Sequence, residues 1–211
     1  MKQVLLSTAY LPPVEYFAFL ISGEALIDGE ERYQKQSYRN RAVVMNGNGK
    51  LNLIIPTIHD QKMSVVKDVR IEYVTPWQRA HWRSIESAYN NTPFYLYYKD
   101  ALKPFFEHKF EYLFEFNTQL TQTLMKCLQI DTKVACTENF SPYEENDLRL
   151  EIHPKAAQKP DYRFRLKEPY YQVFEDKFGF LPNLSVIDLL FNEGPQAAIY
   201  LHNLTKTIEI H

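Results

Sequence analysis

The sequence predicts an α/β protein, with a mixed sheet and a β-hairpin flanked by helices, in a single domain of residues 1–211. Three observations predict this class. The chain opens with a strand, a proline turn and a buried helix; an Asn-Gly turn then marks a hairpin; and later segments keep the helical period. No internal repeat or low-complexity linker divides the chain, so one domain is expected rather than two.

The first elements predict a strand, a helix and a second strand. Val4 to Thr8 is typical of a short buried strand, and Tyr10-Leu11-Pro12-Pro13 ends it. A helix can begin directly after Pro12-Pro13, because proline is tolerated in the first turn of a helix. Residues 14–21 are apolar nearly all round, which indicates a buried helix. Ala25 to Asp28 is the second strand candidate.

The hairpin is the strongest local signal. Val43 to Met45 and Leu51 to Ile55 flank Asn46-Gly47-Asn48-Gly49, and Asn-Gly supplies the positive φ angles of a tight turn. Residues 65–73 predict a further strand.

Two helices are expected next. Thr75-Pro76-Trp77-Gln78 has the pattern of a capping box, and the helix that it opens ends near residues 90–92. A long helix is expected after Pro104, because apolar residues recur there with a period near 3.6. They are Phe106, Phe110, Leu113, Phe114, Leu120, Leu124 and Leu128.

The last third mixes strands and helices. Strands are expected at residues 133–137 and 148–153. A capped helix begins at Asn183 and runs through Phe191, with Gly194-Pro195 as its stop signal. A final helix is expected over residues 196–204, followed by a loose tail or an edge strand after Thr205.

The low glycine content excludes several kinds of site. Only 6 of the 211 residues are glycine, and their positions form neither phosphate-binding glycine motif, G-x-G-x-x-G or G-x-x-x-x-G-K-[ST]. G-x-S-x-G is absent as well. Any bound phosphate is therefore expected to be held by side chains or helix ends, and no cofactor is predicted.

The net charge and the cysteine and histidine content limit the partners, the cell compartment and the metal sites that are expected. A net charge of −2 and a pI near 6.3 give no overall attraction to nucleic acid or anionic membranes, and no apolar stretch is long enough to span a bilayer. Two cysteines, outside any C-x-x-C arrangement, favour a reducing cytoplasm. The six histidines show neither H-x-H nor H-E-x-x-H spacing, so no metal site is predicted.

The segment from Arg32 to Arg41 is the first candidate binding site. It holds four cations and two tyrosines, Arg32, Tyr33, Lys35, Tyr38, Arg39 and Arg41. Guanidinium groups bind phosphate or carboxylate through forked contacts, and the rings offer a surface for a base or sugar. The alternative is a solvated surface whose cations are neutralised by Glu30 and Glu31.

Two residues are candidates for catalysis. His81 shares a helix face with Trp77, Ile85 and Ala88, and a histidine among aromatics can act as general base. The alternative for His81 is a hydrogen-bonded core residue. Asp28 follows a strand, where ligands of α/β sheets bind; its alternative is an ordinary acidic loop.

Four segments together resemble the WbqC-like protein family. They are residues 10–17, residues 33–41 with the hairpin that follows to Pro56, a middle run from Trp77 to Tyr95, and residues 184–195. Members are often encoded among genes for O-antigen and other surface polysaccharides. The segment from Asp147 to Arg165 differs from that of many longer members, and a changed substrate or activity is the expected consequence if it lines a pocket.

The resemblance and the basic segment imply an enzyme that acts on a nucleotide-activated sugar, with acyl or aminoacyl transfer to an amino sugar as one such reaction. Its small anionic substrate is expected at Tyr10, Tyr33, Lys35, Arg39, Arg41 and Tyr89. The alternative is a non-catalytic binding or scaffold protein of a polysaccharide-assembly complex, in which Arg39, Arg41 and His81 share no pocket. The substrate, the reaction and a homo-oligomeric state are left open.

Overall fold

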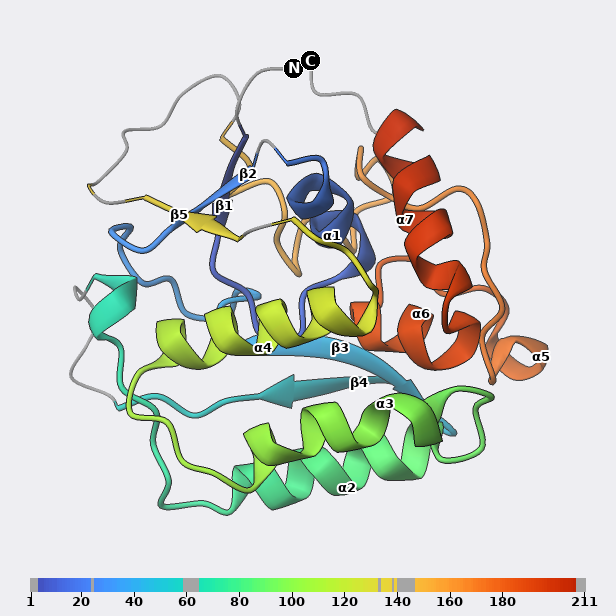
Figure 1. The fold of residues 1–211 in the computed structure, drawn as a ribbon, viewed down its shortest axis with the longest axis horizontal. Helices are drawn as coiled ribbons and strands as arrows, with labels where there is room; N and C mark the ends of the chain where they lie inside the picture. The colour runs from blue at the N-terminus through green and yellow to red at the C-terminus, as the bar shows by residue number, and fades with distance from the viewer. Residues whose placement is uncertain are drawn as a thin grey trace.

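The strands form a parallel sheet and a separate antiparallel hairpin (Figure 1). The computed structural model describes residues 4–23, 25–58, 65–132, 134–137, 139 and 147–207. The parallel sheet has the order β1-β2-β5, with β1 Val4–Ser7, β2 Ala25–Asp28 and β5 Ala135–Cys136. The hairpin pairs β3 Arg41–Asn46 with β4 Gly49–Ile54. The predicted α/β class is confirmed. The hairpin strands β3 and β4 pair only with each other in the described structure and form a sheet separate from the parallel one.

The chain opens as a β-α-β unit built around a fully buried helix. Helix α1, Val14–Ile21, follows β1 and leads back to β2, which pairs in parallel with β1 from Val4↔Ala25 to Ser7↔Asp28. All eight residues of α1 are buried, as the apolar character of the helix predicts for every residue except Glu15. The helix contacts α6 and α7 as well as β2, so no face is left for water.

The other helices surround the sheet and the hairpin. In the view of Figure 1, α4 crosses the middle of the molecule between the two groups of strands, and α2 and α3 lie below the hairpin. No described helix is both long and apolar enough to cross a membrane. The bounds are η1 Val66–Asp68, α2 Trp77–Tyr89, α3 Tyr95–Leu102, η2 Lys103–Phe106, α4 Leu113–Cys127, α5 Glu175–Phe178, α6 Val186–Glu193 and α7 Gln196–Thr207.

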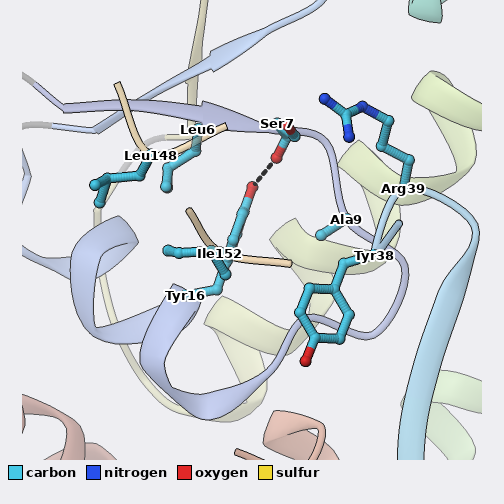
Figure 2. Close-up of a pocket in the computed structure, with 8 residues that line it drawn as sticks. All are labelled: Leu6, Ser7, Ala9, Tyr16, Tyr38, Arg39, Leu148 and Ile152. Carbon is cyan, nitrogen blue, oxygen red and sulfur yellow. Dashed lines mark hydrogen bonds between the residues drawn. The ribbon is translucent and has the colours of Figure 1, made fainter. Parts of the chain in front are cut away.

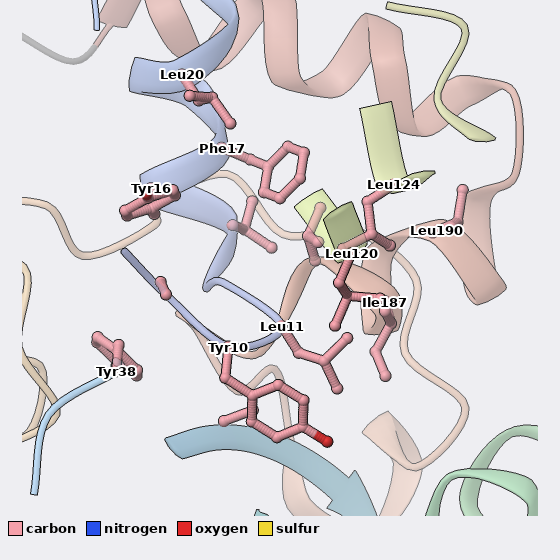
Figure 3. Packing of buried hydrophobic residues seen from close by; sticks show 14 of the residues in the cluster. Tyr10, Leu11, Tyr16, Phe17, Leu20, Tyr38, Leu120, Leu124, Ile187 and Leu190 are labelled. Carbon is pink, nitrogen blue, oxygen red and sulfur yellow. The ribbon is translucent and has the colours of Figure 1, made fainter. Parts of the chain in front are cut away.

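One hydrophobic cluster connects these elements. Figure 3 shows the turn residues Tyr10 and Leu11 among side chains of α1, α4 and α6. These neighbours are Phe17, Leu20, Leu120, Leu124, Ile187 and Leu190. The first motif of the sequence therefore serves as core as well as turn.

The strand predicted over residues 65–73 is wrong. Its middle is the 3-10 turn η1, which buries Val66 and Val69 on one side because residues three apart coincide in such a turn. The backbone N–H groups of Val66 and Lys67 donate to the carbonyls of Glu31 and Gly29 rather than to a strand. Only isolated bridges, such as Ile71 with Thr57, remain.

The strand predicted over residues 148–153 is also wrong. Asp147 accepts the backbone N–H of Arg149 (2.9 Å), and this Asx-type contact bends the chain into a turn. Ile152 then donates to the carbonyl of Leu148. The 133–137 prediction survives in the described residues only as the two-residue strand β5.

The long helix predicted after Pro104 is interrupted. The turn η2 ends at Phe106 and α4 begins only at Leu113, because the backbone between them pairs elsewhere: the N–H of Phe110 donates to the Tyr73 hydroxyl (2.9 Å). Phe105 and Phe110 still stack, with ring centroids 5.8 Å apart. The regular spacing of the apolar residues therefore reflects their burial in one core and not one continuous helix. The sequence did not predict helix α3, which precedes η2.

Of the two predicted helix N-caps, that of α6 is confirmed and that of α2 is wrong. The Thr75 capping box is wrong, because the N-cap of α2 is Pro76 and Gln78 donates instead to the carbonyls of Phe105 and His108. The α6 prediction is confirmed, with Ser185 as the N-cap whose side chain accepts from Ile187. Helix α7 runs three residues past its predicted end.

We predict that Gly194→Ala destabilises the protein strongly. A Cβ there lies 2.4 Å from Cδ1 of Phe94, and φ is +56°, so the variant combines steric overlap with backbone strain. About 1–2 kcal/mol is expected from the positive φ and about 1–3 kcal/mol from overpacking. Urea denaturation measures the difference. Gly23→Ala is the control, since its φ is also positive but nothing lies within 4 Å; equal losses for the two variants contradict the prediction.

Candidate functional site

Polar side chains gather where β1 and β2 end, at the carboxyl edge at which α/β sheets bind ligands. Ser7 ends β1 and Asp28 ends β2. The Ser7 hydroxyl lies 3.3 Å from Oε2 of Glu31 and 3.3 Å from the carbonyl of Arg149. Figure 2 shows the Arg39 guanidinium pointing toward Ser7, and the Tyr16 hydroxyl donating to the Ser7 carbonyl (2.7 Å).

Arg39 and Glu31 form a buried ion pair at this edge. Nε of Arg39 donates to Oε1 of Glu31 (2.8 Å) and Nη2 donates to Oε2, with 1% and 2% of the side chains exposed. Burial raises the pKa of Glu31, and the Arg39 charge opposes that rise. Arg39 also borders a cavity of about 10 Å³, lined in part by Ser7, Tyr16 and Tyr38, which has room for about one water molecule.

Asp28 is the centre of a second buried ion pair. Its Oδ1 accepts from the Glu30 backbone (2.8 Å) and from Oγ1 of Thr137 (2.9 Å), and its Oδ2 accepts from Nη1 of Arg149. Arg149 also bonds both carboxylate oxygens of Asp147. Both Asp28 oxygens are therefore occupied, and this geometry suits an anchor better than a general base. The sequence analysis missed Arg149; its only signal was an Asp-x-Arg spacing in the divergent segment.

Arg41 differs from both buried arginines. It is half-buried at the start of β3, and its Nε is enclosed without a hydrogen-bond partner in the described part of the chain. His153 lies within the field of this group: desolvation lowers the pKa of His153, and the charges of Arg39, Lys155 and Arg41 lower it further. Nδ1 of His153 accepts from the Lys155 backbone (3.1 Å), so its Nε2 carries the proton of the neutral ring. We call Arg41, His153 and Lys155 the cationic face.

Tyr33 and Lys35, two other candidate residues of the basic segment, differ in their exposure to solvent. Tyr33 is buried, with its hydroxyl 3.4 Å from Oγ1 of Thr57, and the charges of Arg39 and Arg41 act on its pKa, which burial raises. Lys35 is exposed. Tyr33 thus lies near the cationic face, while Lys35 points to solvent without a described partner.

His81 is held within the core. The backbone N–H of Ile54 donates to its Nε2 (3.1 Å), so Nδ1 carries the proton and donates to the Tyr10 hydroxyl (3.0 Å). Desolvation lowers the pKa of His81 to about 4. Both ring nitrogens are engaged inside the protein and the Tyr10 ring stacks on His81, which matches the core alternative more closely than a general base or a stacking surface.

Tyr89 belongs to a third cluster around Asp188. Its hydroxyl donates to Oδ1 of Asp188 (2.9 Å), while Tyr170 (2.8 Å) and Gln172 (3.3 Å) donate to Oδ2. Burial raises the pKa of Asp188 to about 6, and these hydrogen bonds oppose the rise. The cluster connects α2, α6 and the chain before α5. The predicted site residues therefore fall into separate groups: Asp28 and Arg39 in ion pairs at the sheet edge, Tyr33 beside Thr57, Arg41 at the start of β3, Tyr10 with His81, and Tyr89 with Asp188.

A buried carboxyl group that the sequence analysis missed lies in the first turn of α1. Glu15 is completely buried; its Oε1 accepts from the Tyr162 hydroxyl (3.3 Å), and its Oε2 has no partner in the described part of the chain. Burial raises the pKa of Glu15 to about 7, against hydrogen bonds that include one from Asn183. Its signal was a charged residue inside an otherwise apolar buried helix. Among the described residues, no group of three or more His, Cys, Asp or Glu is placed to hold a metal ion.

We predict that the Arg39–Glu31 pair shows strong thermodynamic coupling. Arg39→Met leaves Glu31 buried without its partner, which costs about 3–5 kcal/mol. The double variant Arg39→Met/Glu31→Leu removes both charges and should regain most of that loss. A double-mutant cycle by urea denaturation measures the coupling; losses that simply add contradict it.

We predict that Glu15→Gln changes the pH dependence of stability. The folded pKa of Glu15, about 7, exceeds an unfolded value near 4.3, so wild type loses stability as pH rises between these values, by roughly 4 kcal/mol in total. The variant lacks this penalty and should gain stability relative to wild type from pH 5 to pH 7.5. Asp188 titrates in both proteins and cancels. The control is exposed Glu107→Gln; a difference between Glu15→Gln and wild type that stays constant with pH contradicts the prediction.

Comparison with known proteins places this arrangement in a family. A curated relative, Uncharacterized protein Rv1507c of Mycobacterium tuberculosis (strain ATCC 25618 / H37Rv), is 25% identical over 228 residues, which cover 95% of this chain and 97% of the relative. No solved structure matches. The model of the WbqC-like protein family matches residues 8–163, which include Glu15, both buried ion pairs and the cationic face. The chain belongs to the WbqC-like protein family.

Proposed function

We propose that this protein acts on a nucleotide-activated sugar in the biosynthesis of a surface polysaccharide and holds the phosphate groups at the cationic face. The observation that carries the proposal is the enclosed Nε of Arg41, which lacks a hydrogen-bond partner in the described part of the chain; the charge of Arg41 also acts on neutral His153, whose Nε2 carries the proton. Guanidinium and imidazole N–H groups are donors that suit phosphate oxygens.

Charge balance at the sheet edge singles out Arg41. Arg39 is neutralised by Glu31, and Arg149 by Asp28 and Asp147. These pairs leave the positive field of Arg41 and Lys155 available to a ligand.

The proposed reaction is transfer of an acyl or aminoacyl group to an amino sugar. Membership of the WbqC-like family supports the link to polysaccharides, and the absence of glycine-rich phosphate loops is compatible with side-chain recognition. The proposal places the protein in the cytoplasm, where the free thiols of Cys127 and Cys136 stay reduced.

One observation favours the scaffold alternative. The His81 and Tyr10 side chains hydrogen-bond each other in the core rather than contacting the cationic face. The scaffold alternative predicts this separation, because in it Arg39, Arg41 and His81 share no pocket. In addition, Leu96 and Tyr97 of α3 are exposed by 66% and 78%. The ligand experiment below distinguishes the two functions, because a scaffold has no use for a nucleotide sugar.

We predict that uridine- or thymidine-diphosphate sugars stabilise the wild-type protein. At a ligand concentration 100 times Kd, the gain is about 2.7 kcal/mol, or roughly 5–10 °C in Tm at 2–4 °C per kcal/mol. Arg41→Met should abolish most of the shift because it removes the unpartnered donor. Thermal denaturation with and without millimolar ligand measures it.

The control variant is Arg79→Met, which removes an exposed cation of α2 away from the sheet edge. It should retain the wild-type shift. No stabilisation by any of these sugars, or equal shifts for wild type and Arg41→Met, counts against the proposed function.

A further inference from the structure

Two tyrosines near the start of α3 and the start of α5 are exposed to solvent. The side chains of Tyr97 in α3 and Tyr171 in the chain before α5 are 78% and 54% exposed, and Leu96 beside Tyr97 is 66% exposed. Neither tyrosine hydroxyl hydrogen-bonds another described residue. Single exposed apolar residues are common, whereas aromatic residues that lie together on a surface mark interaction sites.

A series of contacts joins the two tyrosines into one surface. The Tyr97 ring packs beside Phe94, with centroids 6.1 Å apart, and the Phe94 ring covers Gly194 closely enough to exclude a Cβ atom there. The residue before it, Glu193, accepts the backbone N–H of Tyr171 at Oε1 (2.9 Å). Figure 1 shows the start of α3 beside α6, as these contacts require.

Glu168 adds a second carboxylate to this surface. The Tyr200 hydroxyl donates to the Glu168 carbonyl (2.6 Å), and the Tyr200 ring packs on that of Tyr170, the residue before Tyr171, with centroids 5.4 Å apart. Burial raises the pKa of Tyr200, and the charges of Glu168 and Glu193 raise it further. We call Phe94, Tyr97, Glu168, Tyr171 and Glu193 the acidic-aromatic surface.

The two carboxylates of the acidic-aromatic surface have no cationic partner among the described residues. Glu193 keeps only its backbone contact, and exposed Lys167 forms no ion pair with Glu168, its neighbour in sequence. Elsewhere an exposed carboxylate is paired, as Glu107 is with Lys103 (3.4 Å). The surface therefore has a negative charge that a cationic partner complements.

We propose that the acidic-aromatic surface docks a basic segment of a partner protein. Lys or Arg side chains of that segment pair with Glu168 and Glu193, and the tyrosine rings bind cations and the apolar stems that carry them. Tyrosines flanked by charged residues also match the usual anatomy of protein interfaces. The inference is independent of the proposed function, because it uses no residue of the cationic face.

The test measures fluorescence anisotropy of two labelled peptides, acetylated and amidated at their ends. One alternates Leu with Arg, and the other has Gln in place of each Arg. Wild type should bind the arginine peptide roughly 10-fold more tightly, from exposed ion pairs and cation–π contacts together. Added salt should narrow this difference, because it screens exposed charges.

Two variants divide the contribution of the rings from that of the charges. Tyr97→Ala should weaken binding of the arginine peptide roughly 10-fold or more, the usual effect of truncating a central aromatic residue of an interface. The double variant Glu168→Gln/Glu193→Gln should remove most of the preference for arginine. It keeps a side-chain oxygen at position 193 that accepts the N–H of Tyr171.

Glu107→Gln/Glu115→Gln is the matched control. It changes the net charge by the same amount at exposed positions outside the acidic-aromatic surface, and it should bind both peptides as wild type does. Thermal denaturation confirms that each variant is folded before titration.

Four outcomes overturn the inference. Equal binding of the two peptides by wild type, or equal losses in the two double variants, shows attraction by net charge alone. Unchanged binding by Tyr97→Ala shows that the rings are not part of a docking site. Self-association of wild type in sedimentation velocity that Tyr97→Ala abolishes shows that a second copy of the chain covers this surface. None of these outcomes affects the proposed function, since no arm uses Arg41 or a nucleotide sugar.

Discussion

The buried Arg39–Glu31 pair is the interaction on which the sheet edge depends. Glu31 receives two donors of Arg39 and lies near the Ser7 hydroxyl, while its backbone carbonyl accepts from Val66 of η1. The carbonyl of Arg39 in turn accepts from Asn117 of α4 (2.8 Å). The pair therefore connects β1, the loop after β2, the entry to the hairpin and α4. Desolvation offsets much of its Coulomb energy, so its main effect is to fix which segments meet.

The pairing of charges at this edge also determines which arginines have carboxylate partners. Arg39 and Arg149 pair with buried carboxylates, whereas Nε of Arg41 has no hydrogen-bond partner in the described part of the chain. A carboxylate that cancelled Arg41 as well would leave no positive field for an anion. The acidic groups of the sheet edge thus pair with Arg39 and Arg149, and none of them forms an ion pair with Arg41 in the described structure.

Local patterns in the sequence predicted the parts of the fold that local forces determine. The β-α-β opening, the Asn-Gly hairpin and the Ser185-capped helix each follow from neighbouring residues. The site was less predictable, because Asp28 meets Arg149 across 121 residues and no short pattern encodes that contact. Arg39 and Arg41 look alike in sequence, yet one is buried against Glu31 and the other is half-exposed. Phe110 kept a helical period outside any helix, since turn residues also pack into the core.

Burial of Glu15 with one unpartnered oxygen costs free energy, and the size of that cost depends on pH. A protonated Glu15 can offer Asn183 a donor, as a glutamine would, whereas the carboxylate that forms above a pH of about 7 cannot, so the amide is the more stable choice only above that pH. Foldable sequences satisfy their buried polar groups, and the exceptions concentrate at functional sites. Nε of Arg41 is another of the buried polar atoms without a partner in the described structure.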